Sequence, residues 1–285
     1  GVIFVSIDDN EVHHLRMVMD EVFGEQNFIG QLIWRKKNTP DARQDIDPTH
    51  EYVCCSCKNS SILAEDEMFG MLPLSEERRK SYSNPDNDSR GPWASVDMTG
   101  MTGRATKDQY FEVTLPSGRI ISPPAGRAWG IAPKTFQSLL AENRIWFGES
   151  GNNVPRIKRF LYEVKGQNTG TLLKENESGS TENAKKQLLE ILKNEEVFDF
   201  PKPIELIRRF ISMQNRQECI ILDFFSGSAT TAHAVLDLNR EDGGNRKFVL
   251  VQMPEATDED SAAYKAGFKD IAEIGKERIR RVIAR

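Results

Sequence analysis

One segment of twelve residues carries the clearest signal of architecture: Ile220-Ile221-Leu222-Asp223-Phe224-Phe225-Ser226-Gly227-Ser228-Ala229-Thr230-Thr231. Its order is an apolar strand, an acid, a loop of small residues and the start of a helix. In a doubly wound α/β sheet, such a turn lies at the carboxyl end of a strand, where ligands bind. Gly227 lets a ligand approach the backbone, and free amides at the helix start favour a carboxylate or a phosphate.

The acid at the end of the strand narrows the choice of ligand. Asp223 can attract a cation, such as an amino group or a sulfonium. A ligand with both an α-carboxylate and a positive centre therefore fits the turn, and S-adenosylmethionine is such a ligand. The spacing is not the GxGxxG of a dinucleotide site. A plain tight turn between a strand and a helix is the alternative interpretation.

Bulk composition indicates a globular protein of one large or two smaller domains. The chain has 285 residues, of which 38 % are hydrophobic and 28 % are charged. No apolar run reaches the roughly 18 residues that a membrane span needs. The four cysteines suit a reducing cytosol better than a disulfide scaffold, so we expect a cytoplasmic protein without membrane contact.

The charge distribution is uneven along the chain. The net charge of −5 argues mildly against nucleic-acid binding, but ten Lys or Arg residues face only five acids between Thr102 and Lys165. A local positive excess of this kind can neutralise phosphates while the rest of the chain stays acidic. A solvated surface is the alternative reading of these charges.

Strands and helices are expected to alternate at both ends of the chain. Apolar runs predict strands at residues 2–7, 28–34, 51–57, 220–222 and 248–251. The near-continuous run at 2–7 is typical of a strand buried on both faces. The rhythm is lost between 59 and 197, where a hairpin is expected around Pro116-Ser117-Gly118. We therefore expect a core formed by 1–58 and 198–285, and a second domain at 59–197.

Several motifs resemble those of one enzyme family. Residues 223–234 (DFFSGSATTAHA) resemble the cofactor motif of amino-methyltransferases that modify DNA, and 198–203 (FDFPKP) resemble the companion motif of permuted, beta-class enzymes. Ala229, where that class more often has glycine, resembles the modification subunits of type III restriction systems. Residues 1–11, 27–37 and 50–52 resemble further core blocks, and 123–129 and 157–161 resemble the target-recognition domain.

The resemblance implies a permuted Rossmann-like S-adenosylmethionine methyltransferase sheet with an inserted α+β target-recognition domain. The implied activity is methylation of adenine N6 in duplex DNA, and the implied partners are a second modification subunit in a homodimer and an ATP-dependent restriction subunit. The implied cofactor contacts are Phe200, Lys202, Pro203, Asp223, Phe224, Phe225, Ser226, Gly227, Ser228, Ala229, Thr230, Thr231 and Gln252. The candidate DNA contacts are Trp34, Arg35, Lys36, Arg127, Trp129, Lys158 and Arg159.

The sequence departs from the family pattern in three places. The Asp-Pro-Pro-Tyr tetrapeptide, which in the family holds the extruded base, does not occur in the 285 residues, so we expect no catalytic residue in this chain and no methylation by the chain alone. Without it, the residues do not distinguish adenine N6 from cytosine N4. Gln252 stands where the family usually has the acid that binds ribose. Both ends are expected to be cut edges of the family's sheet.

Other chemistry is weighed against these motifs. His50 with Cys54, Cys55 and Cys57 fits no usual zinc spacing, so buried strand cysteines are expected and no metal. We expect His233 to pack rather than to catalyse. Trp34 is a candidate to line a pocket for an extruded base, and Trp129 fits either the core or a DNA contact. Two other function classes stay open, a nucleotide-dependent oxidoreductase and a non-catalytic DNA-binding module.

Overall fold

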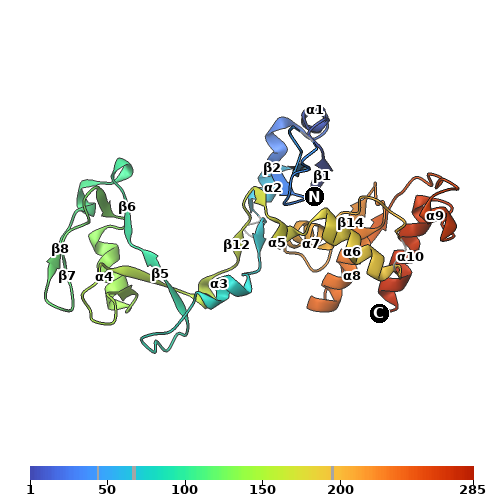
Figure 1. The fold of residues 1–285 in the computed structure, drawn as a ribbon. Coiled ribbons are helices and arrows are strands. Elements are labelled where there is room, and N and C mark those ends of the chain that lie inside the picture. Colours follow the sequence, from blue (N-terminus) through green and yellow to red (C-terminus); the bar gives the residue numbers. More distant parts are fainter. Residues whose placement is uncertain (44, 66–68, 194–195) are drawn as a thin grey trace. The chain divides into compact units, whose positions relative to one another are not determined.

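The computed structural model describes residues 1–43, 45–65, 69–193 and 196–285 (Figure 1). The chain forms two compact units, Gly1–Leu72 with Asn168–Arg285, and Pro73–Gln167. Residues 44, 66–68 and 194–195, which belong to a predicted loop and to the predicted second domain, lie outside the described residues.

The first unit contains a four-stranded sheet in the order β1-β3-β2-β13. Its strands are β1 (Val2–Ile7), β3 (His50–Cys57), β2 (Phe28–Arg35) and β13 (Leu172–Leu173). The first three pair antiparallel, and only β13 runs parallel to its neighbour β2. The apolar runs thus identified the strands correctly. However, β1 is an edge strand with all six residues half-buried, so the expected burial on both faces is wrong.

A core under this sheet joins segments far apart in the chain. Trp34, Val53 and Leu173 of the sheet pack with Leu206 and Phe210 of α7 (Ile204–Ser212). Further elements of the unit are α1 (Val12–Phe23), α2 (Ser60–Glu65), β4 (Met71–Leu72), α5 (Glu175–Ser178), α9 (Ala262–Lys265) and a 3-10 turn at Glu25–Asn27.

The predicted ligand turn lies in a second part of the same unit. Strands β14 (Ile220–Asp223) and β15 (Lys247–Leu250) pair in parallel, and α8 (Thr230–Asp242) connects them. Helices α7 and α8 cover one face of this pair, whereas α10 (Ile271–Ile283) packs against α6 (Thr181–Ile191) and α8. We expected one Rossmann-like sheet in the core; among the described residues, the five strands predicted there are instead divided between the four-stranded sheet and the β14-β15 pair.

The second unit is a small α+β fold. Its main sheet has the order β10-β11-β5, from β10 (Ile145–Trp146), β11 (Arg156–Phe160) and β5 (Trp93–Asp97). Two antiparallel pairs join β6 (Thr99–Met101) to β9 (Arg127–Trp129) and β7 (Val113–Thr114) to β8 (Ile120–Ile121), and the second of these is a hairpin. The remaining elements are α3 (Glu76–Lys80), α4 (Pro133–Ala141) and 3-10 turns at Thr102–Arg104, Lys107–Gln109 and Leu161–Glu163. The short strand β12 (Gln167–Asn168) contains the boundary between the units and pairs with β4.

The division between the units differs from the predicted boundaries. We expected the second domain to cover 59–197, but the described parts of 59–72 and 168–197 belong to the first unit. The reason is packing: Leu173 joins the core under the four-stranded sheet, and Leu188 and Ile191 of α6 pack with Ile274 of α10. Local sequence rhythm does not report such distant contacts.

The cysteines of β3 are buried and free. Cys54, Cys55 and Cys57 are shielded from solvent, and burial raises the pKa of the Cys55 thiol to about 12. The expectation of buried strand cysteines is therefore confirmed. Within the described residues, no three potential metal ligands gather at one place. In the same ranges, no helix combines the length and the apolar character needed to cross a bilayer.

Candidate functional site

The acid that ends β14 ties the strand to the helix that follows it. The Asp223 carboxylate accepts a hydrogen bond from the Thr231 hydroxyl at 2.6 Å through Oδ2, and one from the Phe225 amide at 3.2 Å through Oδ1. A carboxylate has roughly four acceptor positions, so about two stay open for a ligand. Asp223 is thus both a brace of the turn and an available negative charge.

The loop between β14 and α8 contains two residues in the left-handed region. Gly227 has φ 50°, and Ala229, the residue before α8, has φ 60° and ψ 38°. The left-handed conformation costs a residue with a Cβ roughly 1 kcal/mol or more, so the surrounding structure must hold Ala229 in place. Part of that hold is the hydrogen bond from the Ala229 amide to the Ser226 carbonyl, at 2.7 Å.

Gln252, just past β15, supports the loop from the neighbouring strand. Its Oε1 accepts the Gly227 amide at 2.7 Å, and its Nε2 donates to the Met253 carbonyl at 3.3 Å. The Ser226 amide also donates to the Val251 carbonyl. The residue expected to bind ribose therefore also holds the glycine of the turn, a role that an acid would fill equally well as an acceptor.

The Pro-Lys-Pro segment contacts the same loop through its backbone. The Thr230 hydroxyl donates to the Lys202 carbonyl at 3.1 Å, and Pro203 is buried beside the start of α7. Two predicted cofactor contacts that are far apart in the chain are therefore neighbours. Phe200 and Phe225 have side chains that are 77 % and 79 % exposed, so these aromatic rings are open to a ligand.

The Lys202 side chain forms a half-buried charge cluster. Its Nζ lies 2.7 Å from Oε2 of Glu51, whose other oxygen lies 3.2 Å from the Lys36 ammonium. Burial raises the pKa of Glu51, but Lys202 and Lys36 together outweigh it and hold that pKa below its usual range. One carboxylate between two ammonium groups leaves a net positive charge beside the loop. The sequence reading included both lysines but missed Glu51.

Arg278 supports the loop from behind and was also missed. It is 1 % exposed, and its Nη1 donates to the Ser228 carbonyl at 3.2 Å and to the Thr230 hydroxyl at 2.8 Å. The signal was present in the sequence, because Arg278 shares the buried stripe of α10 with Ile274, Gly275 and Val282. A cation on the apolar face of a helix predicts a buried side chain with polar partners in the core.

Comparison with known proteins identifies the family. The model of N6/N4 DNA methylases matches residues 1–257. The chain belongs to the DNA methylase family. The match includes the turn from Asp223 to Thr231, Gln252 and the Pro-Lys-Pro segment.

Curated relatives of the chain include subunits of restriction-modification enzymes. The Mod subunit of the type III enzyme StyLTI from Salmonella typhimurium is 36 % identical over 288 residues, which cover 100 % of this chain and 42 % of that protein. The Mod subunit of EcoP15I from Escherichia coli is 29 % identical, with 98 % and 47 % covered, and the type II methyltransferase M.KpnI from Klebsiella pneumoniae is 31 % identical, with 98 % and 68 % covered. The chain thus spans about half the length of the curated relatives it matches.

One solved structure aligns with almost the whole chain. The putative DNA modification methylase TTHA0409 from Thermus thermophilus, complexed with S-adenosyl-L-methionine, aligns over 99 % of this chain and 68 % of its own, at 13 % identity and a TM-score of 0.36. A similarity of that size adds nothing to the family assignment.

Three of the seven candidate DNA contacts of the chain are buried. Trp34 is 1 % exposed and donates through Nε1 to the Gly179 carbonyl, so it does not line an open pocket. Trp129 is a core residue that donates to the Phe111 carbonyl. Lys158 is paired with Asp86 and Asp88 inside the second unit. We correct these three assignments, because a buried side chain with its polar group already bonded cannot meet a phosphate or a base without rearrangement.

The other four candidate DNA contacts remain accessible to different degrees. Arg35 and Arg159 are exposed, and Lys36 is half-buried in the cluster around Glu51. Arg127 lies 2.9 Å from Asp97 and also bonds Thr99, so its charge is partly compensated. Of the three cationic candidates in the second unit, Arg127, Lys158 and Arg159, Arg159 is therefore the most accessible to a phosphate.

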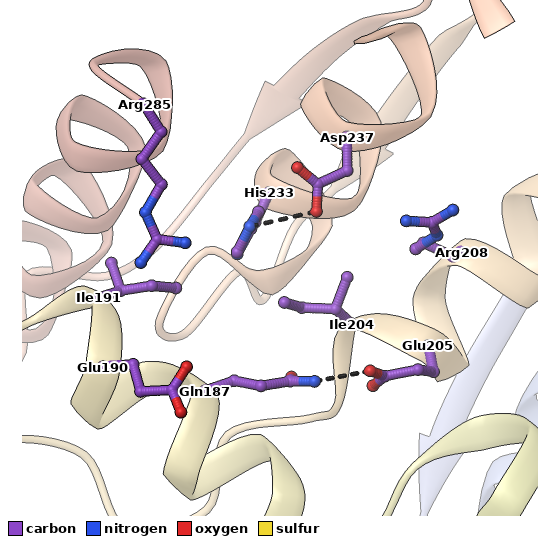
Figure 2. A pocket seen from close by; sticks show the side chains of 9 residues that line it. All are labelled: Gln187, Glu190, Ile191, Ile204, Glu205, Arg208, His233, Asp237 and Arg285. Carbon is purple, nitrogen blue, oxygen red and sulfur yellow. Dashed lines mark hydrogen bonds and ion pairs between the residues drawn. The ribbon is translucent and has the colours of Figure 1, made fainter. Parts of the chain in front are cut away.

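A polar cavity of about 280 Å³ lies beside α8. Figure 2 shows His233 and Asp237 of α8 facing each other on one side, and Gln187 and Glu205 on the other. His233 Nε2 lies 3.2 Å from the Asp237 carboxylate, and its Nδ1 lies 3.4 Å from Nη2 of Arg278. Burial lowers the pKa of His233 to about 3, and the nearby Arg278 charge is the second largest cause. His233 is a buried neutral link between Arg278 and Asp237, so it packs as expected but also bonds.

Proposed function

We propose that this chain is the cofactor-binding and DNA-reading part of an S-adenosylmethionine-dependent methyltransferase that modifies adenine N6 in duplex DNA. The observation that carries the proposal is the turn from Asp223 to Thr231, held by Gln252, Lys202 and Arg278, in a chain of the DNA methylase family. The names of its type III and type II relatives support the restriction-modification context.

The donors and acceptors at the turn fit the proposed cofactor. Asp223 keeps open acceptor positions for an amino group, and the start of α8 favours a carboxylate. The exposed rings of Phe200 and Phe225 offer flat apolar surfaces for an adenine. When bound, the cofactor would supply an electrophilic methyl group on its sulfonium. The residues of this chain would bind and orient it.

We propose that the second unit reads DNA. Its contribution would be cationic contacts to phosphates, from Arg159 and Arg127, that set register on the duplex before a base is extruded. Arg35 and Lys36 stay candidate DNA contacts of the first unit by itself. In this proposal the fold is the permuted Rossmann-like arrangement, and the implied partners are double-stranded DNA, a second modification subunit and an ATP-dependent restriction subunit in the cytoplasm.

The chain by itself would bind the cofactor without transferring its methyl group. The carboxylate and the aromatic ring that hold the extruded base in the resembled family have no counterpart in the 285 residues. Most of the rate gain in such a displacement comes from orientation and electrostatic stabilisation, which those groups provide. Adenine is preferred over cytosine because of the type III relatives.

The test is calorimetric titration of the chain with S-adenosylmethionine. We expect binding by the wild type and roughly tenfold weaker binding by Asp223→Ala, because a charge-assisted contact and the brace to Thr231 are lost. Asp9→Ala is the matched control, since Asp9 is an exposed acid shortly after a strand and has no hydrogen bond to residues 223–231. Equal affinities of the folded Asp223→Ala variant and the control would refute the assignment of the turn.

A further inference from the structure

Arg278 is a buried cation whose direct hydrogen-bond partners are all neutral. Its Nη1 donates to the Ser228 carbonyl, the Ser228 hydroxyl at 3.1 Å and the Thr230 hydroxyl, and its Nη2 faces the His233 ring. The low pKa of His233 keeps that ring uncharged at neutral pH. The Nε of Arg278 has no hydrogen-bond partner among the described residues.

The guanidinium keeps its charge in this setting. Burial lowers the pKa of Arg278 to about 10, which still leaves it protonated at neutral pH. The carboxylate nearest to it in the hydrogen-bond network is Asp237, which is separated from it by the His233 ring. A buried ion without a carboxylate in contact is costly to a fold, so a purely structural role would be filled more cheaply by an apolar side chain.

The placement of the charge points to the cofactor turn. Arg278 bonds the two residues on either side of Ala229, the left-handed residue that starts α8. It approaches from α10, whose Gly275 allows close contact with the Gly227 carbonyl. The guanidinium therefore adds a positive charge to the same helix start where the backbone amides already favour an anion.

We infer that Arg278 is a positioning residue that fixes Ser228 and Thr230 and, through its charge, strengthens binding of the carboxylate end of the cofactor. The inference rests on the proposed function. It concerns a residue that reaches the ligand only through the loop, so it acts on affinity rather than on the transferred methyl group.

The experiment compares two ligands that differ in that carboxylate. S-adenosylhomocysteine carries the amino-acid end, and 5′-methylthioadenosine lacks it. We expect Arg278→Met to weaken S-adenosylhomocysteine binding about tenfold or more, and methylthioadenosine binding less than about threefold. Arg278→Lys, which keeps the charge, should recover part of the loss. Arg280→Met, on the exposed face of the same helix, is the matched control and should behave as the wild type for both ligands.

The outcomes separate this inference from the proposed function. Equal weakening of both ligands, or of neither, in Arg278→Met would refute the inference while leaving the proposed function intact. If the wild type bound neither ligand, the proposed function would fail and the inference with it. Should Arg278→Met not fold, Arg278→Gln keeps hydrogen bonding to Thr230 without the charge, and the same selective loss is expected; equal affinity for both ligands would refute it.

Discussion

Each unit of the chain contains a cation that is only 1 % exposed, Lys158 on β11 and Arg278 on α10. Their surroundings differ. Lys158 bonds two carboxylates, Asp86 and Asp88, whereas Arg278 bonds only a carbonyl, two hydroxyls and a neutral imidazole.

The difference separates a structural charge from one available to a ligand. In the second unit, Arg90, with Lys158, holds the pKa of Asp88 well below its usual range against the effect of burial, so the charges there neutralise one another. In the first unit, the charge of Arg278 has no such partner in contact and lies behind the proposed cofactor turn. Burial of a cation is therefore uninformative until its partners are known.

The largest effect is expected from removing Lys158 from its cluster with Asp86 and Asp88. Lys158→Met leaves Asp86 and Asp88 without their shared ammonium and should destabilise the second unit by about 3 kcal/mol, the lower end for a broken buried pair because Arg90 stays beside Asp88. Arg278→Met leaves only neutral groups unpaired and should cost about 1 kcal/mol. Denaturant unfolding followed by tryptophan fluorescence measures the first, because Trp93, Trp129 and Trp146 lie in that unit. Equal losses in the two variants would contradict the comparison.

A smaller effect is expected from pH. The pKa of His233 falls from 6.5 to about 3 on folding, so between these values the unfolded chain binds a proton that the folded chain does not. The stability that this neutral ring contributes is complete above pH 6.5 and is lost as the pH falls toward 3. From pH 7 to pH 5 the loss should be about 2 kcal/mol. Hydrogen exchange of the α8 amides measures it.

The control for this prediction removes the ring. His233→Gln should flatten the dependence on pH between 7 and 5 while leaving the second unit unchanged, because the carboxylates around Lys158 have lowered pKa values and stay ionised there. An unchanged slope in the variant would show that another group titrates.

The smallest effect concerns DNA. Arg159→Glu should weaken binding of mixed-sequence duplex and reduce the dependence on salt by about one unit for each lost phosphate contact. Lys247→Glu is the matched control, an exposed cation at the start of β15. Lys158→Met is informative as well: if it changed the salt dependence as much as Arg159→Glu in a folded protein, the buried lysine would be a phosphate contact after all.

The turn from Asp223 to Thr231 could be predicted as a local structure because all its signals lie within twelve residues. An apolar strand, its terminal acid, the glycine and the hydroxyl residues of the helix start are read in order, and the structure brings them together with Lys202 and Gln252. The sequence did not predict which side chains pair with residues far away in the chain. The carboxylates that accept from Lys158 belong to Asp88 and Asp86, 70 and 72 residues earlier in the chain. The carbonyl that accepts from Trp34 lies 145 residues later.

The direction of the strands could not be predicted either, because it also depends on partners that are distant in the sequence. The apolar run 2–7 predicts a strand, but only the partner β3 makes it antiparallel and an edge. The boundary of the second unit was missed because residues after 168 look irregular yet complete the cores of the first. Arg278, in contrast, was readable from helical spacing alone.

The close approach of α10 to the cofactor turn restricts how the two segments can change in evolution. A Cβ added at Gly275 would lie 3.2 Å from the Gly227 carbonyl oxygen and 3.3 Å from the Ala229 Cβ. A larger residue at 275 therefore needs the Gly227 carbonyl to shift, whatever stands at 229. Glycine at 229 would relieve the left-handed backbone and remove one of the two close contacts, but the contact with the carbonyl would remain.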